Sequence, residues 1–376
     1  MAVYFMLLLT ALFLVFGERK IVNFPKVSVS LLFLAIPMLF LSMFRSFEVG
    51  SDTRMYVIDW ALPEISESSM VEIAETGRWE IGFAALAKLS LLSSDPPRML
   101  VILTSLFILG LSSFAILKLS NRPALAFSLI ILSSLYYHDM QILRQAIAMS
   151  ILQCALIPLL RKQYLRYVIL VFVAFLFHKS AILLVVLPYA VFLVKFRTKK
   201  SFWLIFGSMC ILLLIFPMSL LNMVMSRLGY ENYVGSQEYG GSNHLAPLLL
   251  LLCFIAWLVS THTAKNNTDQ NVEKDKTNKQ VLLAILFFGI LVSCIAFKIA
   301  ILYRLIPYFL ALFIPLFVND EASDISRDAK ISNVFLSYSP FIGLFIMYTF
   351  LVPSWTAVFP YIVMPLNPAG FLYPLL

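Results

Sequence analysis

The residues of this chain that could do chemistry are a few ionisable side chains placed where long apolar segments end. Arg45, Arg144, His178 and Arg304 can carry positive charge, and Asp52 can carry a negative one. Charged groups at membrane depth are costly and usually mark a substrate path or a binding site. Four cations on one face would suit a lipid-linked phosphate or diphosphate, because its negative charge is fixed and multiple. This hypothesis requires the chain to place all five residues on the same side of a membrane.

The composition is that of a helical membrane protein. The 376 residues are 61% hydrophobic and only 13% charged, with a mean hydropathy of +0.91. A soluble core cannot absorb that much apolar surface, whereas a bundle of transmembrane helices requires it. The net charge of +8 mostly reports cytoplasmic loops in such a protein, so nucleic acid is not an expected partner.

About twelve apolar segments are long enough, or nearly so, to cross a bilayer as helices. By residue number they are 2–16, 27–44, 99–117, 123–137, 143–160, 165–177, 180–196, 202–221, 245–261, 281–297, 301–318 and 333–352. Residues 1–376 are therefore expected to form a single all-α integral membrane domain, a polytopic protein of about 12 transmembrane helices. A large loop separates the second span from the third.

The distribution of Lys and Arg predicts the orientation of the spans. If the N-terminus lies outside, most of the 28 Lys and Arg residues fall in cytoplasmic connections, including the four between residues 195 and 200. The C-terminus then also lies outside. In this orientation the segments 45–98 and 222–244 are outer loops, and the polar segment 262–280 is a cytoplasmic loop.

The outer loop 45–98 contains an amphipathic run from Ile81 to Leu89. Its apolar positions suit a helix that lies on the membrane surface. They suit equally a half-buried helix that packs on the bundle.

With this orientation, all five ionisable residues fall at the outer ends of spans. Arg45 ends the second span, Arg144 opens the fifth, and Arg304 opens the eleventh. Asp52 follows a glycine that allows a tight turn back toward the bundle. The histidine, His178, lies in the minimal turn between the sixth and seventh spans.

Each of these residues also has an ordinary structural explanation. A single Arg at a span end is more often an anchor that reaches for the interface than a ligand. A His in a turn is more often an exposed linker, and Asp52 is explained as well by a side chain that stabilises its own turn. The five residues together indicate a binding site more strongly than any one of them, because cations on the outer side run against the local charge bias.

The same residues carry a resemblance to a known family. The ordered motifs are Phe44-Arg45, Gly50-Ser51-Asp52, Tyr56, Glu80-Ile81-Gly82-Phe83, Arg144-Gln145-Ala146-Ile147-Ala148, Phe177-His178-Lys179-Ser180-Ala181 and Tyr303-Arg304. Together they resemble the Wzy/EpsG-type polysaccharide polymerases, roughly from the second span to the eleventh. Thr53 departs from the pattern, since the family often has an aromatic residue after the Asp.

The resemblance implies a membrane glycosyltransferase of the GT-C-like group that makes a bacterial O-antigen, exopolysaccharide or capsule. Such enzymes join oligosaccharide repeat units carried on undecaprenyl diphosphate at the outer face of the bacterial cytoplasmic (inner) membrane. They release the lipid diphosphate. The implied partners are this lipid-linked substrate and membrane lipid, with a chain-length regulator and a flippase as further candidates, and no cofactor is implied.

The resemblance also implies roles for particular residues. The reaction needs a cationic cradle for the leaving diphosphate and a base for the acceptor hydroxyl. Arg144 and Arg304 fit the cradle, with Arg45 as a third candidate, while Asp52 and His178 compete for the catalytic base. The supporting positions are Tyr56, Glu80, Gln145 and Tyr308. The sequence has no Asp-x-Asp cluster, so we expect a metal-independent reaction in which arginines replace the cation.

Two other classes of membrane protein fit part of this pattern. A lipid-linked oligosaccharide flippase would also have about twelve spans and internal cations, but also two related halves and charges near mid-membrane. A membrane O-acetyltransferase would place a His deeper and take an acyl donor from inside. A purely structural scaffold explains the spans but not the outer cations.

Overall fold

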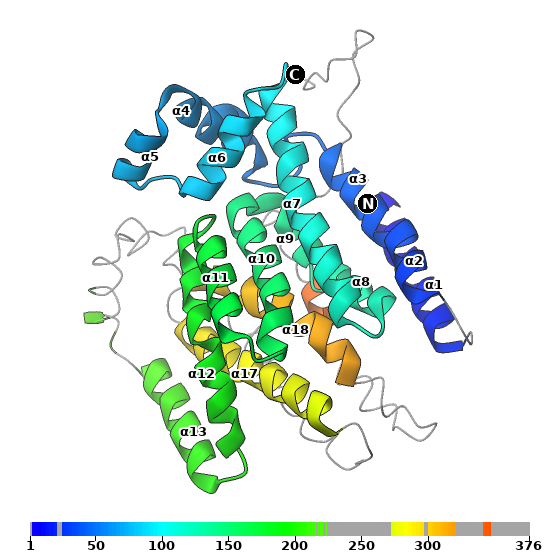
Figure 1. The fold of residues 1–376 in the computed structure, drawn as a ribbon, viewed down its shortest axis with the longest axis vertical. Helices are drawn as coiled ribbons and strands as arrows, with labels where there is room; N and C mark the ends of the chain where they lie inside the picture. The colour runs from blue at the N-terminus through cyan, green and yellow to red at the C-terminus, as the bar shows by residue number, and fades with distance from the viewer. Residues whose placement is uncertain are drawn as a thin grey trace. The chain divides into compact units, whose positions relative to one another are not determined.

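The chain is entirely helical wherever its structure is described. The computed structural model describes residues 2–20, 25–215, 272–296, 300–320 and 341–346, with a few single positions between 217 and 223, and contains no strand among them (Figure 1). The helices of the first part are α1 (Ala2–Lys20), α2 (Lys26–Ser30), a π-turn (Leu31–Ala35), α3 (Ile36–Met43), a second π-turn (Met55–Asp59), α4 (Ala61–Glu67), α5 (Met70–Thr76), α6 (Ile81–Ser90), α7 (Pro96–Leu119), α8 (Pro123–Leu132), α9 (Leu135–Gln141), α10 (Leu143–Leu160) and α11 (Tyr164–Phe175). Those that follow are a 3₁₀ helix η3 (Lys179–Val186), α12 (Leu187–Leu193), a 3₁₀ turn η4 (Val194–Phe196), α13 (Lys200–Ile215), α17 (Val272–Ala296), a 3₁₀ helix η7 (Ala300–Leu305) and α18 (Ile306–Asp320).

Six of the helical segments within the described residues are long and apolar enough to cross a membrane. They are Lys26–Met43, Pro96–Leu119, Leu143–Leu160, Lys179–Phe196, Thr277–Ala296 and Leu302–Asn319. Five shorter apolar helices accompany them: Val3–Glu18, Ile81–Ser90, Pro123–Leu132, Tyr164–Phe175 and Lys200–Ile215. The chain is therefore a multi-pass, all-α membrane protein, as its composition predicts.

Some expected segments fall where the structure is not described. The span 245–261 lies outside the described residues, and so does the outer loop 222–244 apart from position 223. Of the span 333–352, only residues 341–346 are described, and they are helical. In the cytoplasmic loop expected at 262–280, α17 begins at Val272, so the last part of that loop is already helix.

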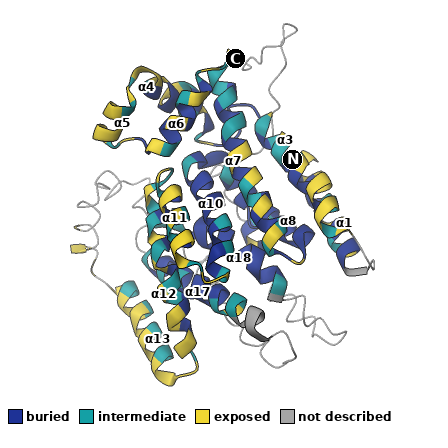
Figure 2. Ribbon diagram, in the orientation of Figure 1, coloured by how far each residue is buried: buried dark blue, intermediate teal, exposed yellow. Residues whose placement is uncertain are grey.

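The described residues form two compact units. Among the described residues, the first comprises 2–20, 25–185, 314–320 and 341–346, and the second comprises 186–215, 272–296 and 300–313. In the first unit, α10 packs between α7 and α11. Figure 2 shows α10 buried along nearly its whole length, so its side chains provide the centre of this unit.

Two local features interrupt the expected spans for clear steric reasons. In the span 26–43, the π-turn lies just before Pro37, which has no backbone N–H and whose ring crowds the preceding turn. The expected span 123–137 is divided at Ser134, which has a φ of 63° and separates α8 from α9. Only Ile142 then connects α9 to α10.

The segment 45–98, which is expected to face outside, is folded rather than extended, and its residues 61–90 contain α4, α5 and α6. A capping box between Ser69 and Glu72 begins α5, and Gly77 ends it in the left-handed region at a φ of 60°. The amphipathic run forms α6, which buries Phe83 and Leu86 and packs on α4, α5 and α7. Of the two alternatives for this run, the structure has the half-buried helix.

The orientation predicts which engineered cysteines react from outside. Glu67→Cys in the outer segment and Thr198→Cys between α12 and α13, each in a chain without its native cysteines, are compared in intact spheroplasts. We expect an impermeant thiol reagent to label the first at once and the second only after lysis, because most Lys and Arg residues lie on the side of Thr198. The opposite pattern would overturn the predicted orientation.

Candidate functional site

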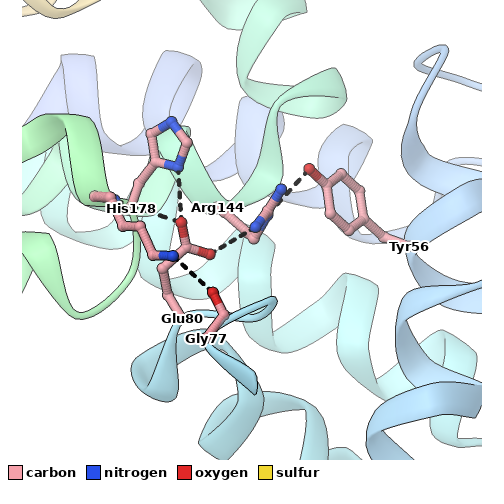
Figure 3. Close-up of polar contacts among 6 residues, drawn as sticks. Tyr56, Gly77, Glu80, Arg144 and His178 are labelled. Atoms are coloured by element: carbon pink, nitrogen blue, oxygen red, sulfur yellow. Dashed lines mark hydrogen bonds and ion pairs between the residues drawn. The ribbon is translucent and has the colours of Figure 1, made fainter. Parts of the chain in front are cut away.

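Glu80 is the centre of a buried polar cluster in the first unit. Its Oε2 accepts a hydrogen bond from Nη1 of Arg144 at 2.6 Å, and its Oε1 lies 3.3 Å from Nδ1 of His178 (Figure 3). The backbone N–H of Lys179 also points to Oε1, at 3.4 Å. Only 6% of the Glu80 side chain is exposed. Two of the residues expected at the outer face, Arg144 and His178, are therefore brought together by a third.

The ionised form of Glu80 is strongly favoured in this cluster. Burial by itself would raise the pKa of the carboxyl, but the hydrogen bond to His178 and the positive charge of Arg144 outweigh it and lower the pKa to about 2. A lowered pKa stabilises the fold at pH values above the ordinary Glu range, and this stabilisation is lost only as the pH falls toward 2. The cluster therefore holds a carboxylate at every physiological pH.

Two hydrogen bonds to backbone carbonyls join the residues on either side of Glu80 to the turn that carries His178. Nζ of Lys179 donates to the carbonyl of Gly77 at 2.6 Å, and the N–H of Gly82 donates to the carbonyl of Leu176 at 2.8 Å. A Cβ on Gly82 would lie 2.8 Å from that carbonyl oxygen, so only glycine permits this approach. The conformation of both segments is thus fixed on either side of the carboxylate.

Arg144 is held on three sides and open on the fourth. Its Nε donates to the hydroxyl of Tyr56 at 3.2 Å, and its guanidinium lies 5.0 Å from the ring centroid of Trp79. Nη2 makes no hydrogen bond within the described part of the chain, and 21% of the side chain is exposed. The guanidinium is therefore positioned by the protein while one of its edges remains available to an anion.

Tyr56 completes this side of the cluster. Burial raises the pKa of its hydroxyl, which the neighbouring Arg144 only partly offsets. Tyr56 therefore stays protonated, accepts from Arg144 and has its own O–H to donate. Its ring lies 5.6 Å from that of Phe83, within an aromatic cluster that also includes Trp79.

Asp52 lies on the turn just before Tyr56, at the edge of the cluster. It is half-buried, and its Oδ1 accepts from the hydroxyl of Ser51 at 3.0 Å. The turn itself is tightly packed, because Gly50 has a φ of 92° and a Cβ there would lie 2.6 Å from the carbonyl oxygen of Met140. The negative charge of Asp52 reaches Tyr56, whose pKa it helps to raise.

Arg45 occupies a different environment from Arg144. It has no exposed surface, and its guanidinium donates to the carbonyl and hydroxyl of Ser42, to Ser105 and to the carbonyl of Met140. Its own carbonyl accepts from Nη1 of Arg98 at 2.8 Å. These contacts join the end of α3 to α7 and α9. A diphosphate could reach Arg45 only by displacing them, so the geometry favours a structural role over the expected cradle.

The remaining expected residues are described separately from the cluster. Gln145 follows Arg144 in α10 and is buried. Arg304 lies in η7 of the second unit and is half-buried, and Tyr308 is buried in the first turn of α18. The shared outer face of Arg304 with Arg144 stays a prediction.

One further buried carboxyl, that of Asp139, is not among the residues predicted from the sequence. It lies in α9 and makes no hydrogen bond or ion pair within the described part of the chain. Burial raises its pKa to about 8. The signal was present in the run Tyr136-Tyr137-His138-Asp139, which places polar groups at the end of an apolar span. Within the described residues, no group of three or more His, Cys, Asp or Glu side chains could hold a metal ion.

The fold and the site are those of a multi-pass helical membrane protein with a buried Glu–Arg–His cluster. The sequence matches the EpsG family over residues 28–363, which is most of the chain, and the protein belongs to this family. No curated protein and no solved structure matches it. Membership associates the chain with polysaccharide synthesis of the polymerase type, as the ordered motifs had indicated.

The contacts of Arg45 predict a stability defect rather than a binding defect. We expect Arg45→Gln to lower the stability of the purified protein by about 2–4 kcal/mol, because several buried carbonyl and hydroxyl groups lose a charged donor. The apparent Tm in detergent measures this. An unchanged Tm with weakened binding of a lipid diphosphate would instead indicate that Arg45 binds the diphosphate.

Proposed function

We propose that this protein is a polysaccharide polymerase with about twelve spans and a GT-C-like arrangement. It joins oligosaccharide repeat units carried on undecaprenyl diphosphate at the outer face of a bacterial cytoplasmic membrane, with both termini outside. The observation that carries the proposal is the Glu80–Arg144–His178 cluster, because it combines a held guanidinium with a held imidazole in a member of the EpsG family.

The proposed reaction is a single displacement at an anomeric carbon. The acceptor hydroxyl oxygen forms a bond to the anomeric carbon of the growing chain, and the bond from that carbon to the diphosphate oxygen breaks. The hydroxyl proton passes to the base, and undecaprenyl diphosphate leaves with the electron pair. The protein has to supply a proton acceptor and a positive group for the leaving oxygens.

The geometry favours His178 over Asp52 as the base. The 3.3 Å contact of Nδ1 with Glu80 orients the imidazole, and with Nδ1–H donated to the carboxylate Nε2 would be the proton acceptor. In Figure 3 the second ring nitrogen of His178 points away from Glu80. The contact that the described residues give Asp52 is a hydrogen bond from the hydroxyl of its neighbour Ser51, which does not orient it toward the Arg144 guanidinium.

Arg144 is proposed to bind the leaving diphosphate through its open edge. It can use Nη2 for a phosphate oxygen while Nη1 keeps its bond to Glu80. Tyr56 adds a hydroxyl donor beside it. One guanidinium cannot balance the multiple negative charge of a diphosphate, so we propose Arg304 as a second guanidinium for the leaving group.

Reconstitution tests the activity directly. Purified protein given lipid-linked repeat units should build chains of many units and release undecaprenyl diphosphate, and deletion of the gene should leave single units on the cell surface. Elongation should persist in EDTA, because guanidinium groups take the place of a metal ion. Activity abolished by EDTA and restored by Mg²⁺ would refute the metal-independent mechanism, and transbilayer movement without joining would favour the flippase alternative.

A second prediction separates ligand arginines from anchors. Arg144→Lys should lose most activity while keeping its charge, because a single nitrogen cannot replace the separate guanidinium nitrogens that face Tyr56, Glu80 and a phosphate oxygen. Arg304→Lys should behave in the same way. Arg161→Lys, in the exposed turn after α10, is the matched control and should be silent. Normal chain lengths from both test variants at normal protein levels would make these arginines anchors.

The pairing of Glu80 with His178 predicts a non-additive defect. His178→Ala should lower kcat by about 10²–10⁴, the usual contribution of a general base. Glu80→Gln should lower it less, because the imidazole remains but loses the partner that fixes its tautomer. The double variant should lose less activity than the product of the two single losses, because the part of the Glu80→Gln loss that acts through His178 is already absent in His178→Ala. The exposed Glu75→Gln is the control, and fully additive losses would mean that the two residues act separately.

A further inference from the structure

A dense group of cations connects α12 to α13 in the second unit. The basic turn, defined here as residues 195–200, contains Lys195, Arg197, Lys199 and Lys200 within six positions. Three of them are exposed and Arg197 is half-buried. Within the described residues none of the four forms an ion pair, so their positive charge is not neutralised by that part of the protein.

The basic turn has a defined conformation. The indole N–H of Trp203 donates to the carbonyl of Arg197 at 2.8 Å. Nη1 of Arg197 donates to the carbonyl of Val194 at 3.4 Å. Nζ of Lys199 lies 5.2 Å from the ring centroid of Phe196, and Nζ of Lys195 lies 5.4 Å from that of Phe192. The turn therefore presents cations and exposed apolar rings side by side.

The helix that begins at this turn offers an open apolar surface. No residue of α13 is buried, as Figure 2 shows. Phe202 and Phe206 contact Phe287 of α17, with centroids 5.2 Å and 4.8 Å apart. The other side is apolar and exposed, with Leu204 at 71% and Ile215 at 68%. An amphiphile with a negative head and apolar chains would match the turn and the helix together.

We propose that the basic turn and the open side of α13 bind an anionic phospholipid. The headgroup phosphate lies among the cations of residues 195–200, and the acyl chains lie along α13. The unneutralised charge favours an anionic lipid over a zwitterionic one, by about fivefold for each Lys or Arg near the surface. It also argues against a hydrophobic protein helix as the occupant, which would leave the cations without partners. This proposal does not depend on the polymerase reaction.

Native mass spectrometry of the full-length protein in detergent tests the proposal. Phosphatidylglycerol and phosphatidylcholine of equal chain length are added together, and the lipids retained are counted. We expect the wild type to retain phosphatidylglycerol preferentially. The variant with Lys195→Gln, Arg197→Gln, Lys199→Gln and Lys200→Gln should lose this preference by about fivefold for each charge removed. The variant with Lys195→Arg, Lys199→Arg and Lys200→Arg should keep it.

The controls distinguish a lipid site from general positive charge. A control variant removes three cations at and after the turn between α10 and α11, by Arg161→Gln, Lys162→Gln and Arg166→Gln, and should keep the wild-type preference. High salt should weaken retention in the wild type, which tests the proposal even if the Gln variant does not fold. Inorganic phosphate should not displace the lipid, because the acyl chains contribute to binding. No preference in the wild type, or equal loss in the control variant, would overturn the proposal.

Discussion

The geometry of the candidate site depends on a carboxylate that has been removed from water. A buried ionised group is costly unless charged and hydrogen-bonding partners surround it, and Glu80 obtains them from Arg144, His178 and the backbone of Lys179. These partners come from the start of α10 and from the turn after α11, far from Glu80 in the sequence. The need to satisfy one carboxylate therefore fixes the relative positions of three separate segments of the first unit.

The surrounding structure keeps that carboxylate partnered. Gly77 ends α5 in a left-handed turn, and Gly82 approaches the carbonyl of Leu176 more closely than any other residue could, so Glu80 is held between two fixed points. Trp79 and Tyr56 cover the guanidinium of Arg144 from the side. Their rings exclude water, and a drier environment strengthens each ionic contact in the cluster. A rigid pair of donor and acceptor groups is what a displacement with a charged leaving group needs.

Hydropathy predicts the long spans well because lipid imposes a simple rule on length and composition. The segment 143–160 coincides with α10, and 99–117 lies within α7. The break at Ser134 was missed, because one residue in a left-handed conformation barely changes the average hydropathy of a span. The site was predicted in part. Arg144 and His178 violate the charge bias and so attract notice, whereas Glu80 lies in an acidic loop and its importance depends on partners that only the fold reveals.

Arg45 and Arg144 illustrate why residue type and sidedness alone cannot assign a role. Both are arginines at the outer end of a predicted span, but the donors of Arg45 are directed to neutral carbonyl and hydroxyl groups in a fully buried space. A ligand that displaced these contacts would leave several polar groups unsatisfied. Arg144 instead bonds a carboxylate and a phenol, and it retains an open edge. The partners of the two arginines, which only the fold reveals, therefore distinguish two positions that the sequence treats alike.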